Sequence, residues 1–366
     1  MEEECVMSGQ GERLLVFVGS YAEPEGPGVH VMELNEETGA LTKLDEVSGL
    51  KNPTFLNLDV QGRKLYAISE ETTSEGARTG SAYAYTIDPA QGSLTEMNHA
   101  VTVDAPTCHI QRDASGRHLV VVSYHSGLVG LVEVRADGTV GRLLDVKQHE
   151  GHGSDPERQE QPHPHSAFFS RDNRFVFVPD LGLDRIVSYA LDTENNVLKP
   201  HGEAAVPPGA GPRHMAFHPG GKLAFVINEL NSTVTSFRYD EETGVLEPIE
   251  TVTTLPEGFT GESYCAEILV SEDGAYVYGS NRGHDSIVVF AADQASGKLT
   301  LVEHVSAEGK HPRHFALTPG GEFLIAANRD TDNIATFRVD RSSGRLQYTG
   351  QSAVVSKPVC VRPAYL

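Results

Sequence analysis

Tryptophan is absent from this 366-residue chain, and cysteine is scarce, being limited to four positions. These are Cys5, Cys108, Cys265 and Cys360. None has the CxxC spacing of a metal or redox motif, so we expect free thiols that serve as packing residues, with neither a disulfide framework nor a thiolate zinc site.

The chain also lacks any run of about eighteen apolar residues, which a membrane-spanning helix would need. Its first residues, Met1 to Glu4, are acidic where a secretory signal is basic. We therefore expect a cytoplasmic protein that does not bind membranes.

Positive charge is also in short supply. The 29 Lys and Arg are outnumbered by 51 Asp and Glu, which gives a formal net charge of −22. The electric field of a protein with this net charge repels nucleic acid and anionic membranes. It does not exclude a small anionic substrate, because a few arginines in one cleft can reverse the local potential.

One turn recurs along the whole chain. A Gly or Asn stands two residues before an apolar residue, and successive apolar residues are 46 to 58 positions apart. The Gly or Asn positions are Gly39, Gly92, Gly138, Asn196, Gly244, Gly297 and Gly344. Asparagine is the expected substitute if the backbone there needs a positive φ. Alternating or β-branched residues flank each turn, so we predict seven hairpins.

A second turn precedes most of these by about twenty residues and leads into a short apolar strand. It is found at Gly62, Gly116, Asn173, Gly221, Gly274 and Gly321. Two hairpins per repeat make four strands, and no helical periodicity is present. The sequence therefore predicts an all-β, seven-bladed β-propeller of four-stranded antiparallel blades. The absence of tryptophan excludes the Trp-Asp type of blade.

The two ends of the repeat predict how the ring closes. The strand at 14–18 lacks a preceding partner, and the tail at 358–363 reads as that missing strand. The C-terminal strand should therefore complete the first blade and remove two open sheet edges. Residues 1–366 then form one domain, with residues 1–13 flexible and residues 149–164 as an inserted loop. Long loops on a rigid scaffold are often lids or binding loops.

Equivalent positions in a propeller lie on a ring around the central axis, so the repeat register also predicts which residues meet. The starts of the innermost strands bring His165, Arg213 and Arg313 to one mouth of the channel. The loops after the second strands bring Glu229, Arg282 and Arg329 to the same mouth. His214 follows Arg213 directly. Charged residues that converge on a channel mouth favour a binding site, although they could also pair with each other as polar filling. We interpret His149, His152 and His163 as histidines of a solvated loop, with metal binding as the lesser alternative.

Several segments resemble the propeller-type 6-phosphogluconolactonases, whose superfamily includes carboxy-cis,cis-muconate cyclase. They are Gln161–Ser166, Pro179–Arg185, Gly211–His214, Asn228–Leu230 and Ser280–Ser286. The resemblance implies an enzyme without a metal or organic cofactor. It also implies that the His, two Arg and Glu of the family site match His165, Arg213, Glu229 and Arg282.

These residue types suit lactone hydrolysis. We expect Glu229 as general base and His165 as general acid, with the reverse assignment open. Arginine is a forked cationic donor, so we expect Arg213 and Arg282 to hold an anionic lactone, most directly 6-phosphogluconolactone. Arg313, Arg329 and His214 would support them. No Gly-x-Ser-x-Gly motif is present, which argues against a serine acyl-enzyme.

Three other functions stay open at this point. One is a cycloisomerase that runs lactone chemistry in reverse on a muconate-like dicarboxylate. Another is a non-catalytic propeller that binds a protein or peptide at the channel mouth, although the loop at 149–164 carries no aromatic anchor. The last is a calcium-dependent sugar lactonase, which would need carboxylates converging on the axis.

Overall fold

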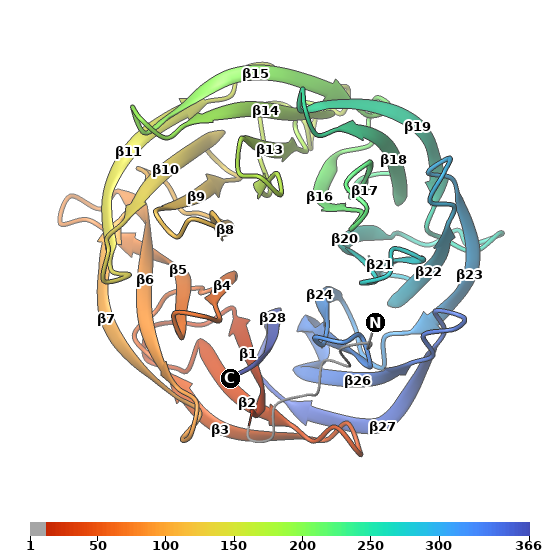
Figure 1. The fold of residues 1–366 in the computed structure, drawn as a ribbon, viewed down its shortest axis with the longest axis horizontal. Helices are drawn as coiled ribbons and strands as arrows, with labels where there is room; N and C mark the ends of the chain where they lie inside the picture. Colours follow the sequence, from red (N-terminus) through yellow and green to blue (C-terminus); the bar gives the residue numbers. More distant parts are fainter. Residues whose placement is uncertain (1–11) are drawn as a thin grey trace, which may run out of the picture.

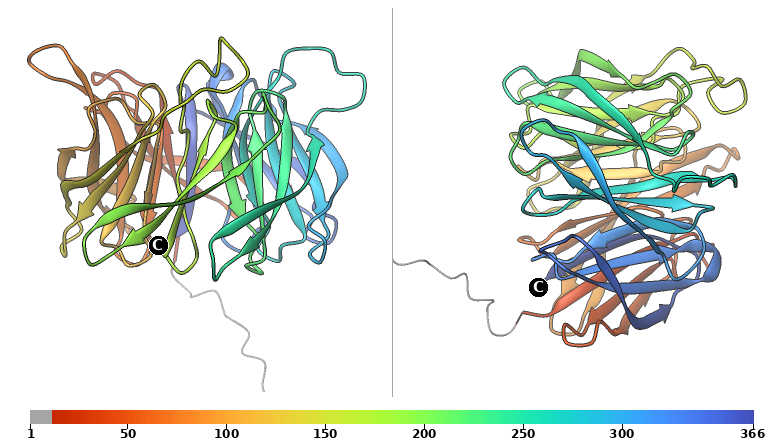
Figure 2. Two further views of the ribbon diagram at one scale, coloured as in Figure 1. Left: turned by 90° about the horizontal axis from the view of Figure 1, so that it is seen from above. Right: turned by 90° about the vertical axis from the view of Figure 1, so that its right-hand side faces the viewer.

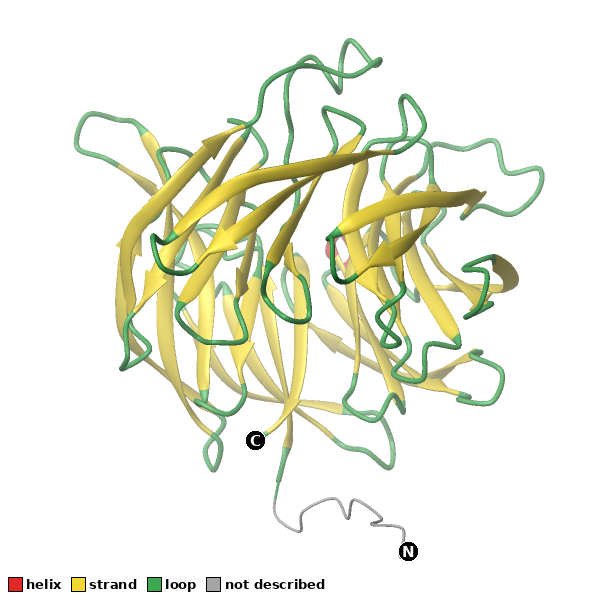
Figure 3. Cartoon of the chain, turned by 45° about the horizontal axis from the view of Figure 1, so that its top comes forward, coloured by secondary structure: helices red, strands yellow, loops and turns green. Residues whose placement is uncertain are grey.

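The described residues, 12–366 of a computed structural model, form a ring of seven four-stranded sheets around a central axis (Figure 1). All strand pairings are antiparallel, and the one short helix in this part of the chain is the 3₁₀ turn η1 (Arg329–Thr331). Figure 3 shows how completely strands dominate the molecule. The predicted seven-bladed propeller is confirmed.

The strands of each blade follow one another from the axis of the ring outward. Blade 1 contains β28 (Pro358–Tyr365), β1 (Leu14–Ser20), β2 (Val29–Leu34) and β3 (Leu41–Val47). Blade 2 contains β4 (Leu56–Asp59), β5 (Lys64–Thr72), β6 (Arg78–Asp88) and β7 (Ser93–Val101). Blade 3 contains β8 (His109–Arg112), β9 (His118–Ser123), β10 (Leu128–Val134) and β11 (Val140–Gln148). Blade 4 contains β12 (Phe168–Phe169), β13 (Phe175–Asp180), β14 (Arg185–Asp192) and β15 (Val197–Ala205).

The remaining three blades have the same order. Blade 5 contains β16 (Pro212–Phe217), β17 (Leu223–Asn228), β18 (Thr233–Asp240) and β19 (Val245–Thr253). Blade 6 contains β20 (Tyr264–Val270), β21 (Tyr276–Arg282), β22 (Ser286–Ala292) and β23 (Leu299–Ser306). Blade 7 contains β24 (Pro312–Leu317), β25 (Phe323–Asn328), β26 (Asn333–Val339) and β27 (Leu346–Val354).

The recurring turn has the backbone conformation that its residues imply. The six glycines have φ values between +67° and +85°, and Asn196 has a φ of +55°. A side chain with a Cβ is strained there unless it is Asn or Asp, which is why glycine recurs. Second strands such as β9 and β17 are fully buried, whereas outer strands such as β7 and β11 consist mostly of half-buried and exposed residues. The apolar core therefore lies in the interfaces between neighbouring blades.

The ring closes as the sequence predicts. β28 pairs with β1 from Leu14 opposite Tyr365 to Ser20 opposite Pro358. The two side views of Figure 2 mark the chain end on the face where β28 finishes, opposite the mouth at which β28 begins. Arg13 forms backbone hydrogen bonds with Leu366 and a side-chain pair with Glu33 (2.7 Å). Residues 1–11, the rest of the segment predicted to be flexible, lie outside the described residues, as does Cys5.

Deleting residues 358–366 should unfold or aggregate the protein, because both β1 and β24 would lose the strand on which they pack. Thermal melting and size-exclusion chromatography measure the effect. Tyr365→Phe is the matched control, since it removes only an exposed hydrogen bond to Glu36. A truncated chain that elutes as a monomer with an unchanged Tm would contradict the closure argument.

Candidate active site

Bulges at the starts of inner strands turn two arginines toward the channel mouth. In β16 the pairing register shifts between Pro212 and His214, and in β24 between Pro312 and His314. The extra residue at each shift is Arg213 or Arg313. Bulges of this kind release a side chain from the regular alternation of a strand and re-aim it.

The mouth contains a cavity of about 410 Å³. Both predicted rings of residues contribute to its wall. From the starts of inner strands come Thr54, Thr107, His165, Tyr264 and Arg313, and from the ends of second strands come Tyr21, His125, Glu229 and Arg282. The repeat register therefore brings His165, Glu229, Arg282 and Arg313 to one cavity, as expected from the sequence.

Glu229 lies at the centre of an arginine cluster. Its Oε1 accepts a hydrogen bond from Arg158 Nη2 (2.8 Å). Its Oε2 forms ion pairs with Arg282 Nη2 (2.7 Å) and Arg213 Nε (3.1 Å). The carboxylate is 7% exposed. Arg282 and Arg213 also donate to the carbonyls of Cys265 and Ala266, each at 2.6 Å. Both oxygens of Glu229 are thus committed to cationic donors.

This arrangement sets the charge of each member. Burial opposes ionisation of Glu229, but Arg282 and Arg213 outweigh it and hold its pKa far below the ordinary value. Burial and the neighbouring Arg313 lower the pKa of Arg213 to about 9, so Arg213 is still a cation at neutral pH. Glu229 is therefore an anion that cannot readily accept a proton.

His165 has a different environment. Its Nδ1 is buried and has no hydrogen-bond partner among residues 12–366, and its ring lies edge-on to Tyr124 and His214. Burial, reinforced by Arg213, holds the pKa of His165 well below its usual value. The imidazole is therefore neutral at physiological pH.

Arg313 is a cavity-lining cation without a carboxylate partner in the described part of the chain. Its guanidinium lies 5.8 Å from the ring centre of Tyr21. The wall as a whole carries four arginines, Arg78, Arg158, Arg282 and Arg313, against Glu70 and Glu229. Because Arg213 adds a further charge at Glu229, the cavity is positive inside a strongly acidic protein.

Three residues expected to bind or support substrate do not line the cavity, namely Arg213, His214 and Arg329. Arg213 instead pairs with Glu229. His214 lies in the channel, where its Nδ1 is 3.1 Å from both oxygens of the buried Glu267, which also contacts His314. After the bulge at Arg213, the next side chain on β16 faces a different part of the channel. Arg329 lies in η1, where its Nε donates to Asp330 (2.6 Å). We therefore assign none of these three residues a contact with the substrate.

Three further cavity residues, Arg158, Tyr124 and Arg78, were not predicted from the sequence. Arg158 is the single Lys or Arg of the inserted segment 149–164, which is a signal that could have been used. Its guanidinium contacts Tyr124 Oη (3.5 Å) and lies over the ring of Tyr264. The repeat register cannot place such a residue, because an insertion has no equivalent in the other blades.

The inserted segment is anchored to blade 4. Gln159 is fully buried, and its Nε2 donates to Leu181 O (2.8 Å) and Asp184 Oδ1 (2.6 Å). The interpretation of His149 and His163 as solvated residues is wrong, since they are 5% and 4% exposed. His149 pairs with Asp180 (2.6 Å), and His163 stacks on Tyr124. The segment forms a fixed wall that holds Arg158 beside Glu229.

Cys108 also lines the cavity, and the structure shows it as a free thiol together with Cys265 and Cys360. Burial raises the pKa of Cys108 to about 11, so the reactive thiolate is scarce at neutral pH. Within residues 12–366, no group of three or more His, Cys, Asp or Glu is arranged to hold a metal ion. The groups that the cavity offers for chemistry therefore include the imidazoles of His165 and His125 and several arginines.

Comparison with known proteins identifies the family of this chain. The family model for lactonases with a seven-bladed β-propeller matches residues 15–363. The 6-phosphogluconolactonase of Bacillus subtilis is 38% identical over 304 residues, which cover 83% of this chain and 84% of the relative. That of Formosa agariphila is 35% identical over 313 residues, covering 84% and 87%. The solved structure of the periplasmic gluconolactonase of Pseudomonas aeruginosa gives a TM-score of 0.89 at 32% identity, covering 96% of this chain and 99% of that one.

The chain therefore belongs to the family of seven-bladed β-propeller lactonases, a class of hydrolases that open cyclic esters. In the described residues, no helix has the length and apolar character that crossing a bilayer requires. The cytoplasmic location stays a prediction, as does the absence of nucleic-acid binding.

Replacing Gln159 by Ala should loosen the inserted segment, because four backbone and side-chain partners would lose their hydrogen bonds at a buried position. We expect a loss of about 2–3 kcal/mol in the free energy of unfolding and faster tryptic cleavage after Arg158. Gln161→Ala is the control in the same segment, since Gln161 makes only an exposed contact with His125 O. Equal cleavage rates in both variants would show that Gln159 is not the anchor.

Proposed function

We propose that this enzyme hydrolyses a phosphorylated sugar lactone, with 6-phosphogluconolactone as the best candidate. The observation that carries the proposal is the unpaired guanidinium of Arg313 in a positive cavity that also holds a neutral His165. A forked cation without an acidic partner suits a phosphate group. The names of the Bacillus and Formosa relatives support the same substrate.

Hydrolysis needs a base for water, stabilisation of the carbonyl oxygen, and an acid for the leaving ring oxygen. In the proposed mechanism, His165 takes a proton from water as the water oxygen attacks the lactone carbonyl. Arg158 or Arg282 stabilises the resulting oxyanion. The bond between the carbonyl carbon and the ring oxygen then breaks, and the His165 imidazolium returns its proton to that oxygen. The products are a carboxylic acid, which ionises at neutral pH, and a hydroxyl group.

This mechanism differs from the assignment expected from the sequence, in which Glu229 and His165 divide the two proton transfers. Glu229 has both oxygens bonded to arginines, so it is a poor base. We assign it the role of holding Arg158, Arg213 and Arg282 in one arrangement around the substrate. His165 is neutral, lines the cavity and forms no ion pair among residues 12–366, so its imidazole can act first as base and then as acid.

The other functions fit the cavity less well. A calcium-dependent mechanism needs free carboxylates on the axis, but Glu229 is bonded to arginines and Glu267 to His214 and His314. A binding module would not need a neutral imidazole beside an arginine cluster. A cycloisomerase would use the same residues, so the substrate assay must separate it from a lactonase.

The purified protein should hydrolyse 6-phosphogluconolactone, and EDTA should leave the rate unchanged. Arg313→Ala should raise KM for the phosphorylated lactone by at least about tenfold, since a charge-assisted hydrogen bond is lost, with a much smaller effect on gluconolactone. Arg329→Ala is the control, because Arg329 does not line the cavity. Turnover of a muconate-like dicarboxylate without lactone hydrolysis would instead favour the cycloisomerase.

The pH dependence separates the roles of His165 and Glu229. As a base, His165 must be neutral, so activity should be retained above its folded pKa and lost as pH falls through that value, below 6.5. Burial is the main cause of the low pKa and Arg213 the next, so Arg213→Gln should move this acid limb to higher pH. His165→Gln should lower kcat by about 10²–10⁴-fold. If Glu229→Gln instead abolishes the acid limb while His165→Gln stays active, Glu229 is the base.

A further inference from the structure

A second large hollow lies on the face opposite the active site, between blades 2 and 3. It has a volume of about 590 Å³. Its walls come from the start of β5, the end of β8, the start of β9 and the hairpin between β10 and β11. The active site uses the other ends of these strands, at residues such as Glu70 and Tyr124. The two sites are therefore on opposite faces of the ring.

The charge of this hollow is opposite to that of the whole chain. Five cationic side chains line it, namely Lys64, Arg112, Arg117, Arg135 and Arg142. They face two carboxylates, Asp59 and Glu133. A net charge of −22 over the chain makes such a local excess of positive charge unexpected on a surface that serves only solubility.

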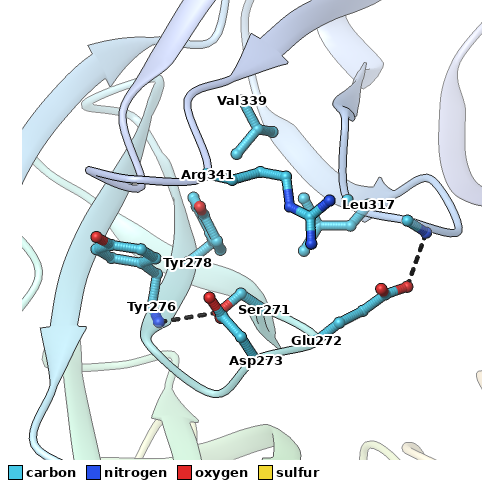
Figure 4. A pocket seen from close by; sticks show the side chains of 10 residues that line it. Ser271, Glu272, Asp273, Tyr276, Tyr278, Leu317, Val339 and Arg341 are labelled. Carbon is cyan, nitrogen blue, oxygen red and sulfur yellow. Dashed lines mark hydrogen bonds between the residues drawn. The ribbon is translucent and has the colours of Figure 1, made fainter. Parts of the chain in front are cut away.

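The repeat supplies internal comparisons. The corresponding hollow of blade 5, about 630 Å³, has Lys222 and Arg238 against four carboxylates, Asp240, Glu241, Glu242 and Glu247. A hollow between blades 6 and 7, shown in Figure 4, encloses only about 20 Å³. Its one cation, Arg341, stands with Glu272 and Asp273 (Figure 4). Of these three hollows, only the one between blades 2 and 3 is positive, so its charge does not follow from the fold.

Four of the five cations have no carboxylate partner among residues 12–366. Arg112 pairs with Asp59 (2.9 Å), and Arg135 donates to Val140 O (3.0 Å). Lys64 and Arg142 make no side-chain hydrogen bond or ion pair in that part of the chain. Arg117 contacts only Ser115 Oγ, at 3.3 Å. Donors for several anionic oxygens are therefore available.

The wall behind these cations is held firmly. The buried His118 has its Nδ1 3.3 Å from Asp113 Oδ2 and its Nε2 2.9 Å from Asn196 Oδ1. Hydrogen bonding to Asp113 raises the pKa of His118. Asn196 occupies the turn position that is glycine in the other six repeats. Its side chain links blade 4 to blade 3 at the edge of the hollow.

We propose that this hollow is a second binding site, for the phosphate groups of a small molecule such as a phosphate ester or pyrophosphate. Arginine and lysine donors without acidic partners match phosphate oxygens. The volume is of the size that small ligands occupy. The acidic remainder of the protein repels long polyanions, which disfavours nucleic acid as the ligand.

Isothermal titration with pyrophosphate tests the site. The background is Arg313→Ala, which weakens anion binding at the active site. Adding Lys64→Ala and Arg142→Ala should weaken the remaining binding at least about tenfold, the expected cost of lost hydrogen bonds to charged groups. Lys222→Ala with Arg238→Ala, in the acidic hollow of blade 5, is the matched control and should leave binding unchanged. With Arg313 intact, Lys64→Ala/Arg142→Ala should keep the KM of the lactonase.

Three results would overturn the proposal. The first is no pyrophosphate binding in the Arg313→Ala background. The second is equal weakening by the control pair, which would show a general charge effect. The third is tighter binding of single-stranded DNA than of pyrophosphate at 150 mM salt, which would identify a nucleic-acid surface instead. Thermal melting of each variant shows that it is folded.

Discussion

The pairing of β28 with β1 is the constraint on which the rest of the structure depends. A propeller is a closed circle, so the position of each blade around the axis is fixed only when the first and last segments of the chain join. Closure also removes the two open edges that an unclosed ring would expose. Once the circle is fixed, the starts of all inner strands meet at one mouth, and residues more than a hundred positions apart become neighbours.

The site uses this geometry to concentrate charge of one sign. Arg158, Arg213 and Arg282 come from different segments and share the carboxylate of Glu229. Buried cations repel one another strongly, so an anion between them is needed to keep them close. In this arrangement His165 is neutral, and Arg313 has no carboxylate partner among residues 12–366. Glu229 thus organises the positive cavity while other groups are left to meet the substrate.

Much of the fold could be predicted because it repeats. The recurrence of glycine at Gly39 and the equivalent turns shows, from this sequence alone, where the backbone needs a positive φ. The closure by residues 358–363 follows because the first blade would otherwise lack its innermost strand. The same register brought His165, Glu229, Arg282 and Arg313 to one mouth. The register could not place Arg158, because the inserted segment has no equivalent position in the other blades. Nor could it foresee that a bulge at Arg213 turns His214 toward Glu267, or that Asp180 and Tyr124 bury His149 and His163.

A positive cavity inside an acidic protein affects how the substrate arrives. At distances beyond the cavity, the net charge of −22 repels an anionic lactone, and only close to the mouth do the arginines dominate. Dissolved ions screen the outer field over about 8–10 Å at physiological ionic strength, but screen partly buried groups much less. Moderate salt should therefore speed the encounter of enzyme and anion, in contrast to enzymes whose surfaces attract their substrates.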